Sequence, residues 1–352
     1  MQVATLVYFN AAKIVAMVSI PWINATGRRI VRESHGARVN RFNSSSIPAS
    51  IDQPPRDNTM KSIDRRTFLC ATAGTLASTV LVKPTSAGAT GSAKNPWKKA
   101  FMLGNVTKGS PLASFQLLKE AGFDGVELIS PNGLDLNDVL SARDKTGLTI
   151  HGVSGGRHWT DTLADPDPQV VARGMAAIRK EFADCKAYGG TTVLLVPAVV
   201  NTKIGYRDAY KRSQERIREL LPDAEKHGIK IAIENVWNKF LLSPLEFTKY
   251  IDDFKSPWVG AYFDVGNIIE YGNPEDWIHE LGKRILKVHI KEYKREQRFS
   301  YRLGEGGIDW LAVRTALSDI GYDGWVTAEV GYESLEGMKD VVRRMNDLLQ
   351  LA

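Results

Sequence analysis

Four acidic or imidazole side chains end short apolar segments in the second half of the chain. Each follows a run rich in Val, Ile, Leu or aromatic residues, and the four are Glu234, Asp264, His289 and Glu329. Three carboxylates and one imidazole form a mostly oxygen donor set, which suits one divalent cation, with Mn²⁺, Mg²⁺ or Co²⁺ favoured and Zn²⁺ as the alternative. Without a cation, three clustered carboxylates would repel one another and at least one would hold a proton. The competing interpretation is that these are ordinary charges at strand ends.

The elements that must position these residues are eight short apolar runs, each followed by a helical pattern or a loop. The runs are Phe101–Val106, Gly125–Ile129, Leu148–Val153, Thr192–Pro197, Ile229–Glu234, Val259–Val265, Ile285–Ile290 and Trp325–Val330. This alternation is typical of parallel strands joined by crossover helices. Eight units predict an α/β fold, a (β/α)8 TIM barrel, in which the carboxyl ends of the strands share one face. An open doubly wound sheet is the competing fold, but no Gly-x-Gly-x-x-Gly follows the first run.

Glycine separates several helical patterns from the strands that follow them. The positions are Gly122, Gly147, Gly189, Gly228 and Gly321. Glycine adopts the left-handed conformation that ends a helix, so these positions predict helix C-termini. The segments 122–127 and 321–325 also resemble one another, which indicates a weak internal repeat of one β/α unit.

Residues 60–89 have the features of a twin-arginine export signal, in the required order. Arg65 and Arg66 precede Phe68, an apolar run without charges extends to Val82, and small residues end at Ala89. We predict cleavage after Ala89, with the barrel occupying residues 90–352 and the mature protein lying in the periplasm or otherwise outside the cytoplasm. A chance basic pair before a short buried helix is the alternative.

Residues 1–59 stand in front of this signal, where an export signal is expected to be near the start of the chain. Met60 begins a leader of normal shape, so we predict that residues 1–59 are disordered or not translated natively. A membrane anchor is the competing interpretation, but Lys13 interrupts the apolar stretch, and a membrane-spanning helix needs about 20 apolar residues.

The net charge of +6 comes from the leader and the residues before it. Residues 1–89 hold 11 of the 46 Lys and Arg and 4 of the 40 Asp and Glu, which leaves 35 basic and 36 acidic side chains in residues 90–352. This balance removes the electrostatic argument for binding nucleic acid or a membrane surface. We therefore expect no nucleic-acid partner and no stable membrane association after cleavage. Of the two cysteines only Cys185 would remain, which leaves no disulfide.

The chain resembles the sugar phosphate isomerase and epimerase superfamily, which has a xylose isomerase-like TIM barrel. The resemblance covers roughly residues 101–349. The motifs that carry it are Glu234-Asn235, Phe263-Asp264-Val265-Gly266-Asn267, Val288-His289-Ile290-Lys291-Glu292 and Leu303-Gly304-Glu305-Gly306-Gly307-Ile308-Asp309-Trp310. It implies one divalent metal bound by Glu234, Asp264, His289 and Glu329, and it implies that Glu234 and Glu329 are the catalytic pair that transfers protons.

Several further residues are candidates for substrate binding. Glu127 and His151 end the second and third runs, and each has a structural alternative, a salt bridge for Glu127 and a satisfied core histidine for His151. The resemblance implies a substrate contact at Arg295, whereas Asn267 stands where many relatives carry a histidine. Three aromatic residues near strand ends are candidates for lining a sugar pocket: Trp159, Trp237 and Tyr262. In the loop after the seventh run, Lys294, Arg298 and Arg302 could join Arg295 in binding a phosphate, and Glu305 is expected to order the loop.

These residues predict a metal-dependent isomerase or epimerase that acts on a ketose or sugar phosphate through an enediolate. A metal that binds the carbonyl and a neighbouring hydroxyl acidifies the adjacent C–H, and a carboxylate pair removes and returns the proton. Two alternatives use the same site, a keto-inositol dehydratase-like lyase and a sugar-binding barrel without catalysis. The other alternative, an endonuclease of the same barrel type acting at abasic DNA sites, needs a multinuclear zinc cluster with several histidines. Only His289 and His151 are candidates near the expected site face. The sugar, the native metal and homo-oligomerisation are left open.

Overall fold

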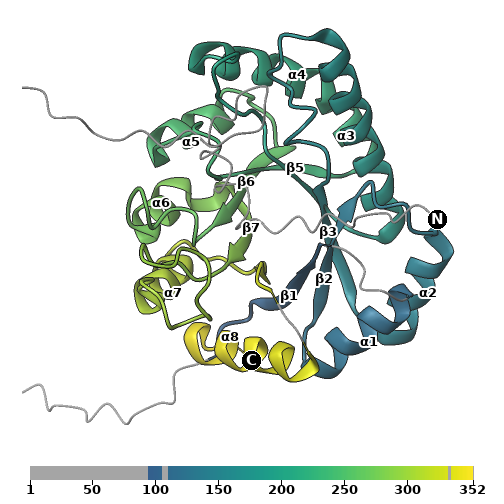
Figure 1. Ribbon diagram of the computed structural model, residues 1–352, viewed down its shortest axis with the longest axis vertical. Helices are drawn as coiled ribbons and strands as arrows, with labels where there is room; N and C mark the ends of the chain where they lie inside the picture. The colour runs from purple at the N-terminus through teal and green to yellow at the C-terminus, as the bar shows by residue number, and fades with distance from the viewer. Residues whose placement is uncertain (1–93, 105–109, 332–333, 352) are drawn as a thin grey trace, which may run out of the picture. The chain divides into compact units, whose positions relative to one another are not determined.

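The computed structural model describes residues 94–104, 110–331 and 334–351, which all belong to one compact unit, Gly91–Ala352. Eight parallel strands form a closed barrel in sequence order, and Figure 1 looks into it with the helices outside. The strands are β1 (Lys98–Leu103), β2 (Gly125–Ser130), β3 (Thr149–Gly155), β4 (Thr192–Leu195), β5 (Lys230–Glu234), β6 (Val259–Asp264), β7 (Ile285–Ile290) and β8 (Trp325–Ala328). The predicted (β/α)8 barrel is confirmed.

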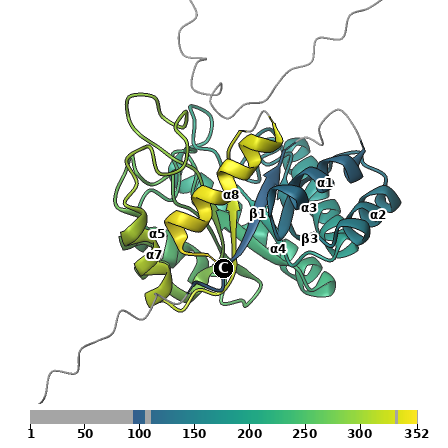
Figure 2. The same ribbon diagram turned by 90° about the horizontal axis from the view of Figure 1, so that it is seen from below.

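A helix follows each strand and covers the outside of the barrel. The helices are α1 (Pro111–Ala121), α2 (Leu136–Thr146), α3 (Pro168–Tyr188), α4 (Tyr206–His227), α5 (Pro244–Asp252), α6 (Pro274–Leu281), α7 (Trp310–Asp319) and α8 (Leu335–Leu349), with a 3-10 turn η2 (Gly282–Arg284) before β7. The last helix, α8, packs against α1 and so completes the ring beside β1 (Figure 2). No helix in the described residues is both long enough and apolar enough to span a membrane.

The helix ends have local causes that are visible in the sequence. Asp135 and Asp167 accept hydrogen bonds from the first backbone N–H groups of α2 and α3, which would otherwise lack partners. Gly122 and Gly189 end α1 and α3 with φ of 102° and 87°, a left-handed conformation that glycine adopts without steric cost. The glycines therefore end helices as the sequence predicted.

Two packing layers hold the fold together. The larger apolar core lies where the outward faces of the strands meet the helices, and it includes Phe101, Phe182 and Val288. A separate small apolar cluster consists of Leu194, Ala232 and Tyr262. The buried side chains also include many polar ones, and those that contact one another across the barrel are Glu127, His151, Tyr262, Lys287, His289 and Thr327. TIM barrels usually fill this space with branched apolar residues, and the polar interior of this barrel departs from that pattern.

The observed strands differ from the predicted runs mainly at their ends. β1 begins at Lys98 rather than Phe101, because Lys98 pairs with Trp325 in β8 and its ammonium lies 5.4 Å from the centre of that ring. β8 ends at Ala328, one residue before Glu329, whose backbone N–H still bonds Ile290 O at 2.9 Å. β4 and β8 each end two residues before the end of the predicted run, whereas β2 and β3 extend one and two residues past theirs, so composition locates a strand but not its ends.

Three predictions concern residues outside the described part of the chain. They are the region 1–59, the export signal in 60–89 and the end of the first run beyond residue 104. Within the described residues, Cys185 is a free, buried thiol.

Candidate metal centre

The four predicted metal ligands meet at the carboxyl ends of four consecutive strands. Glu234 and Asp264 are the last residues of β5 and β6, His289 lies in β7 directly beside Asp264 in the strand register, and Glu329 follows β8. One ligand atom from each residue lies within 4.8 Å of the others. Glu234 and Glu329 are about 95 residues apart in sequence, and the closed barrel brings them together, as the sequence predicted.

The imidazole of His289 lies at the centre of this group. Its Nδ1 is 3.1 Å from Glu234 Oε1, 3.5 Å from Glu329 Oε2 and 4.0 Å from Asp264 Oδ2. Asp264 and His289 are fully buried, whereas the Glu329 side chain is 25% exposed. The cluster is therefore enclosed on the β6 and β7 side, and Glu329 is its most solvent-accessible member.

Lys291 also enters the cluster, and the sequence analysis did not single it out as a site residue. Its Nζ lies 2.7 Å from Glu329 Oε2 and 3.0 Å from Asp264 Oδ2, and 5.0 Å from the centre of the Phe299 ring. Side chains alternate between the two faces of a strand, so the spacing of two residues from His289 already places Lys291 on the same face. The ammonium partly offsets the three carboxylates.

Burial and charge perturb the acid groups in opposite directions. Burial raises the pKa of Asp264 to about 7, with Glu329 and Glu234 adding to the rise, and burial also raises the pKa of Glu234. Burial acts the same way on Glu329, but Lys291 and His289 outweigh it and lower the pKa of Glu329 to about 2. Asp264 and Glu234 are therefore harder to ionise than free carboxyl groups unless a further cation is present.

The residues fit a divalent ion. Asp264 Oδ2 is buried and has no aligned hydrogen-bond donor, although Lys291 Nζ lies 3.0 Å away, so this oxygen has a lone pair to offer. Together with the carboxylates of Glu234 and Glu329 and the Nδ1 of His289, it gives the oxygen-rich donor set that Mn²⁺, Mg²⁺ and Co²⁺ favour. A divalent cation would replace the protons of the acid groups and relieve their mutual repulsion.

Glu127 and His151 lie deeper in the barrel than the cluster. Glu127 is fully buried, and its two oxygens contact His289 Nε2 at 3.2 Å and the Tyr262 hydroxyl at 2.5 Å. His151 is 2% exposed, and its ring nitrogens contact Lys287 Nζ at 2.9 Å and Thr327 Oγ1 at 3.1 Å. Substrate binding by Glu127 and His151 stays a prediction, while the observed contacts match the structural alternatives for both residues.

Asn267 and Arg295 occupy different positions at the mouth of the barrel. Asn267 donates its side-chain amide to Asn235 O at 2.9 Å and its backbone N–H to Asp264 Oδ1 at 2.8 Å, so it holds the loop after β6 against the cluster. The Arg295 side chain is 78% exposed and lies 3.4 Å from Glu270. A substrate contact by either residue stays a prediction.

The aromatic candidates are divided between the interior and the mouth. Tyr262 is fully buried beneath the cluster, and Trp159 is 41% exposed. The Trp237 ring lies at an angle of 48° to that of Phe299, with ring centres 5.0 Å apart. Arg298 lies over the Trp237 ring at 5.4 Å, and Lys294 over the Tyr301 ring at 5.9 Å. Two of the basic side chains proposed for a phosphate are thus stacked on aromatic rings.

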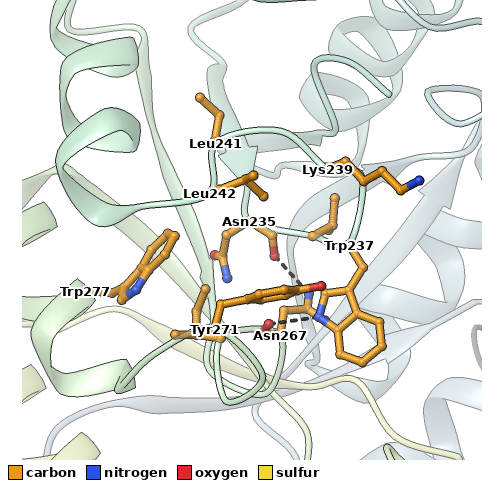
Figure 3. Close-up of a pocket in the computed structure, with 10 residues that line it drawn as sticks. Asn235, Trp237, Lys239, Leu241, Leu242, Asn267, Tyr271 and Trp277 are labelled. Carbon is orange, nitrogen blue, oxygen red and sulfur yellow. Dashed lines mark hydrogen bonds between the residues drawn. The ribbon is translucent and has the colours of Figure 1, made fainter. Parts of the chain in front are cut away.

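A small hollow lies between the loops that follow β5 and β6, next to the proposed metal ligands through Asn235 and Asn267. Figure 3 shows the rings of Trp237, Tyr271 and Trp277 around it, with Trp237 Nε1 bonded to Asn267 O and Asn267 bonded to Asn235. The side chains of Asn235 and Asn267 are hydrogen-bonded within the protein, and the lining is mostly aromatic and aliphatic. Such a surface suits the apolar faces of a sugar ring.

Glu292 organises the loop after β7, and the sequence analysis did not identify this role. Its buried carboxylate accepts hydrogen bonds from Gly304 N at 2.7 Å, Ile308 N at 3.3 Å and Trp310 Nε1 at 2.9 Å. Glu305, which was expected to order the same loop, bonds Arg344 at 2.5 Å. The motif 303–310 therefore serves to fix the loop that carries Phe299 over Lys291.

Known proteins match most of the described chain. A ketose 3-epimerase from Arthrobacter globiformis is 28% identical over 61% of this chain and 76% of its own length. A D-psicose 3-epimerase from Ruminiclostridium cellulolyticum is 26% identical over 59% of this chain and 74% of its own. The uncharacterised protein MJ1311 from Methanocaldococcus jannaschii is 31% identical, but the match spans only 32% of this chain and 41% of that protein.

Solved structures agree on the fold. The structure of 3-keto-D-glucoside 4-epimerase from Escherichia coli superposes with a TM-score of 0.62 and 19% identity, covering 72% of this chain and 99% of that one. Residues 115–348 match the family model described as xylose isomerase-like TIM barrel. The chain belongs to the xylose isomerase-like TIM barrel family.

Proposed function

We propose that this protein is a metal-dependent epimerase that acts on a ketose or a related keto-sugar. The observation that carries the proposal is the convergence of Glu234, Asp264, His289 and Glu329 within 4.8 Å at the carboxyl ends of four strands. The ketose 3-epimerase and D-psicose 3-epimerase activities named for two of the relatives support the reaction class.

The proposed chemistry needs a bound cation and two proton-transferring groups. When bound, a divalent ion would polarise the sugar carbonyl and stabilise the negative charge of an enediolate. Glu234 and Glu329 come from β5 and β8, with β6 and β7 between them, so they would approach a sugar from different sides. One carboxylate would remove the proton from carbon, and the other would deliver one to the opposite face.

The surroundings favour a sugar without a phosphate group. Arg298 and Lys294 lie over aromatic rings, and Arg295 lies near Glu270, so three of the four basic side chains proposed for a phosphate in the loop after β7 already have partners. The rings of Trp237, Tyr271 and Trp277 next to the site would suit the apolar face of a sugar or of a group attached to it. An unphosphorylated substrate also agrees with export by the twin-arginine route, which stays a proposal, because sugar phosphates are mainly cytoplasmic.

The proposal is tested on the mature protein beginning at Thr90. Its metal content is measured, and the Mn²⁺-loaded protein is incubated in D₂O with a panel of free ketoses, keto-glycosides and keto-inositols. Deuterium at one carbon together with a new epimer supports the epimerase. Loss of water from a keto-inositol would instead identify a lyase, and binding without exchange would identify a sugar-binding protein; either result would overturn the proposal.

A further inference from the structure

We propose that a chain of buried hydrogen bonds inside the barrel fixes the tautomer and orientation of His289 and thereby sets the affinity of the metal centre. The residues of this relay are Lys287, His151, Thr327, Tyr262 and Glu127. The inference rests on the metal site of the proposed function and does not depend on which substrate is turned over.

The relay is continuous from the middle of the barrel to the metal centre. Lys287 Nζ lies 2.9 Å from His151 Nδ1, and His151 Nε2 lies 3.1 Å from Thr327 Oγ1. The Tyr262 hydroxyl lies 3.2 Å from Thr327 Oγ1 and 2.5 Å from Glu127 Oε2. Five strands contribute to it, so the closed barrel is what brings its members together.

The last step of the relay reaches the proposed ligand. Glu127 Oε1 lies 3.2 Å from His289 Nε2, on the side of the ring opposite the carboxylates of the cluster. Both ring nitrogens of His289 are thus in contact with carboxylates, Nε2 with Glu127 and Nδ1 with the cluster.

The direction of every proton in the relay follows from the groups themselves. An ammonium has only donors, so Lys287 donates to His151 Nδ1, and the neutral His151 ring must carry its proton on Nε2. That proton goes to Thr327 Oγ1. Because the Tyr262 hydroxyl has one proton and gives it to Glu127, we infer that the Thr327 hydroxyl, 3.2 Å away, donates to the Tyr262 oxygen. The Tyr262 proton goes to Glu127, because an ionised carboxylate can only accept.

The direction of these hydrogen bonds fixes the tautomer of His289. The second oxygen of Glu127 also accepts only, so His289 must present a proton at Nε2. In the neutral ring, Nδ1 is then the nitrogen with a free lone pair, and it faces Glu234, Asp264 and Glu329. A carboxylate that fixes a ligand histidine in this way raises its basicity and its affinity for the metal.

Because the relay is buried, the loss of any one of its hydrogen bonds leaves a polar group without a partner. All five residues and His289 are between 0 and 3% exposed, so water has little access to replace a lost partner. Lys287 and Glu127 place opposite charges at the two ends of the relay, which lowers the cost of burying either one. An apolar interior would stabilise a barrel at least as well, so stability alone does not account for five buried polar residues at its centre.

The test compares two tyrosine variants that each lose one buried hydroxyl. Tyr262→Phe breaks the relay, whereas Tyr250→Phe is the matched control, because Tyr250 is also fully buried and its hydroxyl lies 2.7 Å from Ser213 Oγ in the helical layer. Calorimetric titration with Mn²⁺ is expected to show affinity weakened about tenfold to a hundredfold in Tyr262→Phe and unchanged in Tyr250→Phe. Glu127→Gln is expected to weaken binding at least as much as Tyr262→Phe, and Lys287→Met less.

A second readout reports the tautomer directly. In the Zn²⁺-loaded protein labelled with ¹⁵N-histidine, the nitrogen shifts of His289 are expected to show a proton on Nε2 and metal on Nδ1. Metal on Nε2, or a folded Tyr262→Phe protein that binds Mn²⁺ as tightly as the wild type, would overturn the relay. These results differ from a failure of the proposed function, in which the wild type binds metal and the relay variants weaken it, yet no sugar exchanges its proton.

Discussion

The ammonium of Lys291 donates to Glu329 Oε2 at 2.7 Å, at the most exposed member of the metal cluster. Lys291 is 9% exposed, so the pair sits in a region of low effective dielectric, where a positive charge has a large effect on its neighbours. Because Nζ also lies 3.0 Å from Asp264 Oδ2, Lys291 contacts the same oxygens that a cation would need.

Replacing Lys291 with methionine is expected to tighten the binding of Mn²⁺ by about tenfold, because the cluster gains one unit of negative charge and loses a competitor for two carboxylates. Calorimetric titration of the metal-free protein measures the change. Lys283→Met is the matched control, since Lys283 is an exposed lysine in η2. Unchanged or weaker binding in Lys291→Met would show that Lys291 supports the metal rather than competing with it.

Metal affinity is expected to rise with pH through the neutral range, because a cation must displace protons from Asp264 and from His289. Burial lowers the pKa of His289, but the carboxylates around it, Glu127 first among them, raise it well above its usual value. The pKa of Asp264 is raised to about 7, mainly by burial, so below this pH a cation must displace a proton from Asp264 before it binds. Each unit below pH 7 should weaken binding about tenfold for each proton displaced. Titrations between pH 5.5 and 8.5 measure the profile, and an affinity independent of pH would contradict the assignment of Asp264 as a ligand.

The same shift affects the stability of the metal-free protein. Asp264 has a raised folded-state pKa, so the folded form binds more protons than the unfolded form between about pH 4 and pH 7. The contribution of Asp264 to the free energy of unfolding therefore falls as pH rises through this range. Denaturant titrations of the wild type and Asp264→Asn at pH 5 and pH 7.5 should show this pH dependence in the wild type and a smaller one in the variant.

Metal removal is expected to destabilise the barrel. A ligand that binds only the folded state at a hundred times its Kd contributes about 2.7 kcal/mol, so chelation should lower the Tm by several degrees. Melting curves with EDTA and with Mn²⁺ measure this difference. Asp264→Asn should melt at nearly the same temperature in both conditions, and a full metal-induced shift in that variant would argue for a binding site elsewhere.

Glu292→Ala is expected to lower the free energy of unfolding by about 3 kcal/mol, because Gly304 N, Ile308 N and Trp310 Nε1 lose a buried acceptor. Glu296→Ala, at an exposed position of the same loop, is the control and should change stability by less than about 0.5 kcal/mol. Urea denaturation compares them. Equal stability of the two variants would mean that the motif 303–310 holds the loop without Glu292.

The sequence predicted the eight strands and the convergence of the four proposed ligands because both depend on local patterns. An apolar run followed by a helical pattern identifies a barrel strand, and a polar residue at its end falls on the face where strand ends gather. Glu234 and Asp264 end their strands in this way. The roles of the four residues as ligands stay a prediction until a metal is measured.

The interior relay could not be predicted from the same patterns. Lys287, His289 and Lys291 are spaced by two residues, which indicates that they share one face of β7, but not which residues they meet. His151 meets Thr327 across 176 positions of sequence, and the stagger of the strands around the closed barrel decides this pairing. Patterns within a single strand therefore could not decide whether Glu127 and His151 bind substrate or have a structural role.

The central claim, that Glu234 and Glu329 move a sugar proton at a metal centre, is tested most directly by deuterium exchange. The Mn²⁺-loaded wild type is predicted to incorporate deuterium from D₂O next to the carbonyl of a ketose or keto-sugar. Glu234→Gln and Glu329→Gln are each predicted to slow this exchange by about 10²- to 10⁴-fold. Exchange at the wild-type rate in either variant with metal still bound would contradict the account.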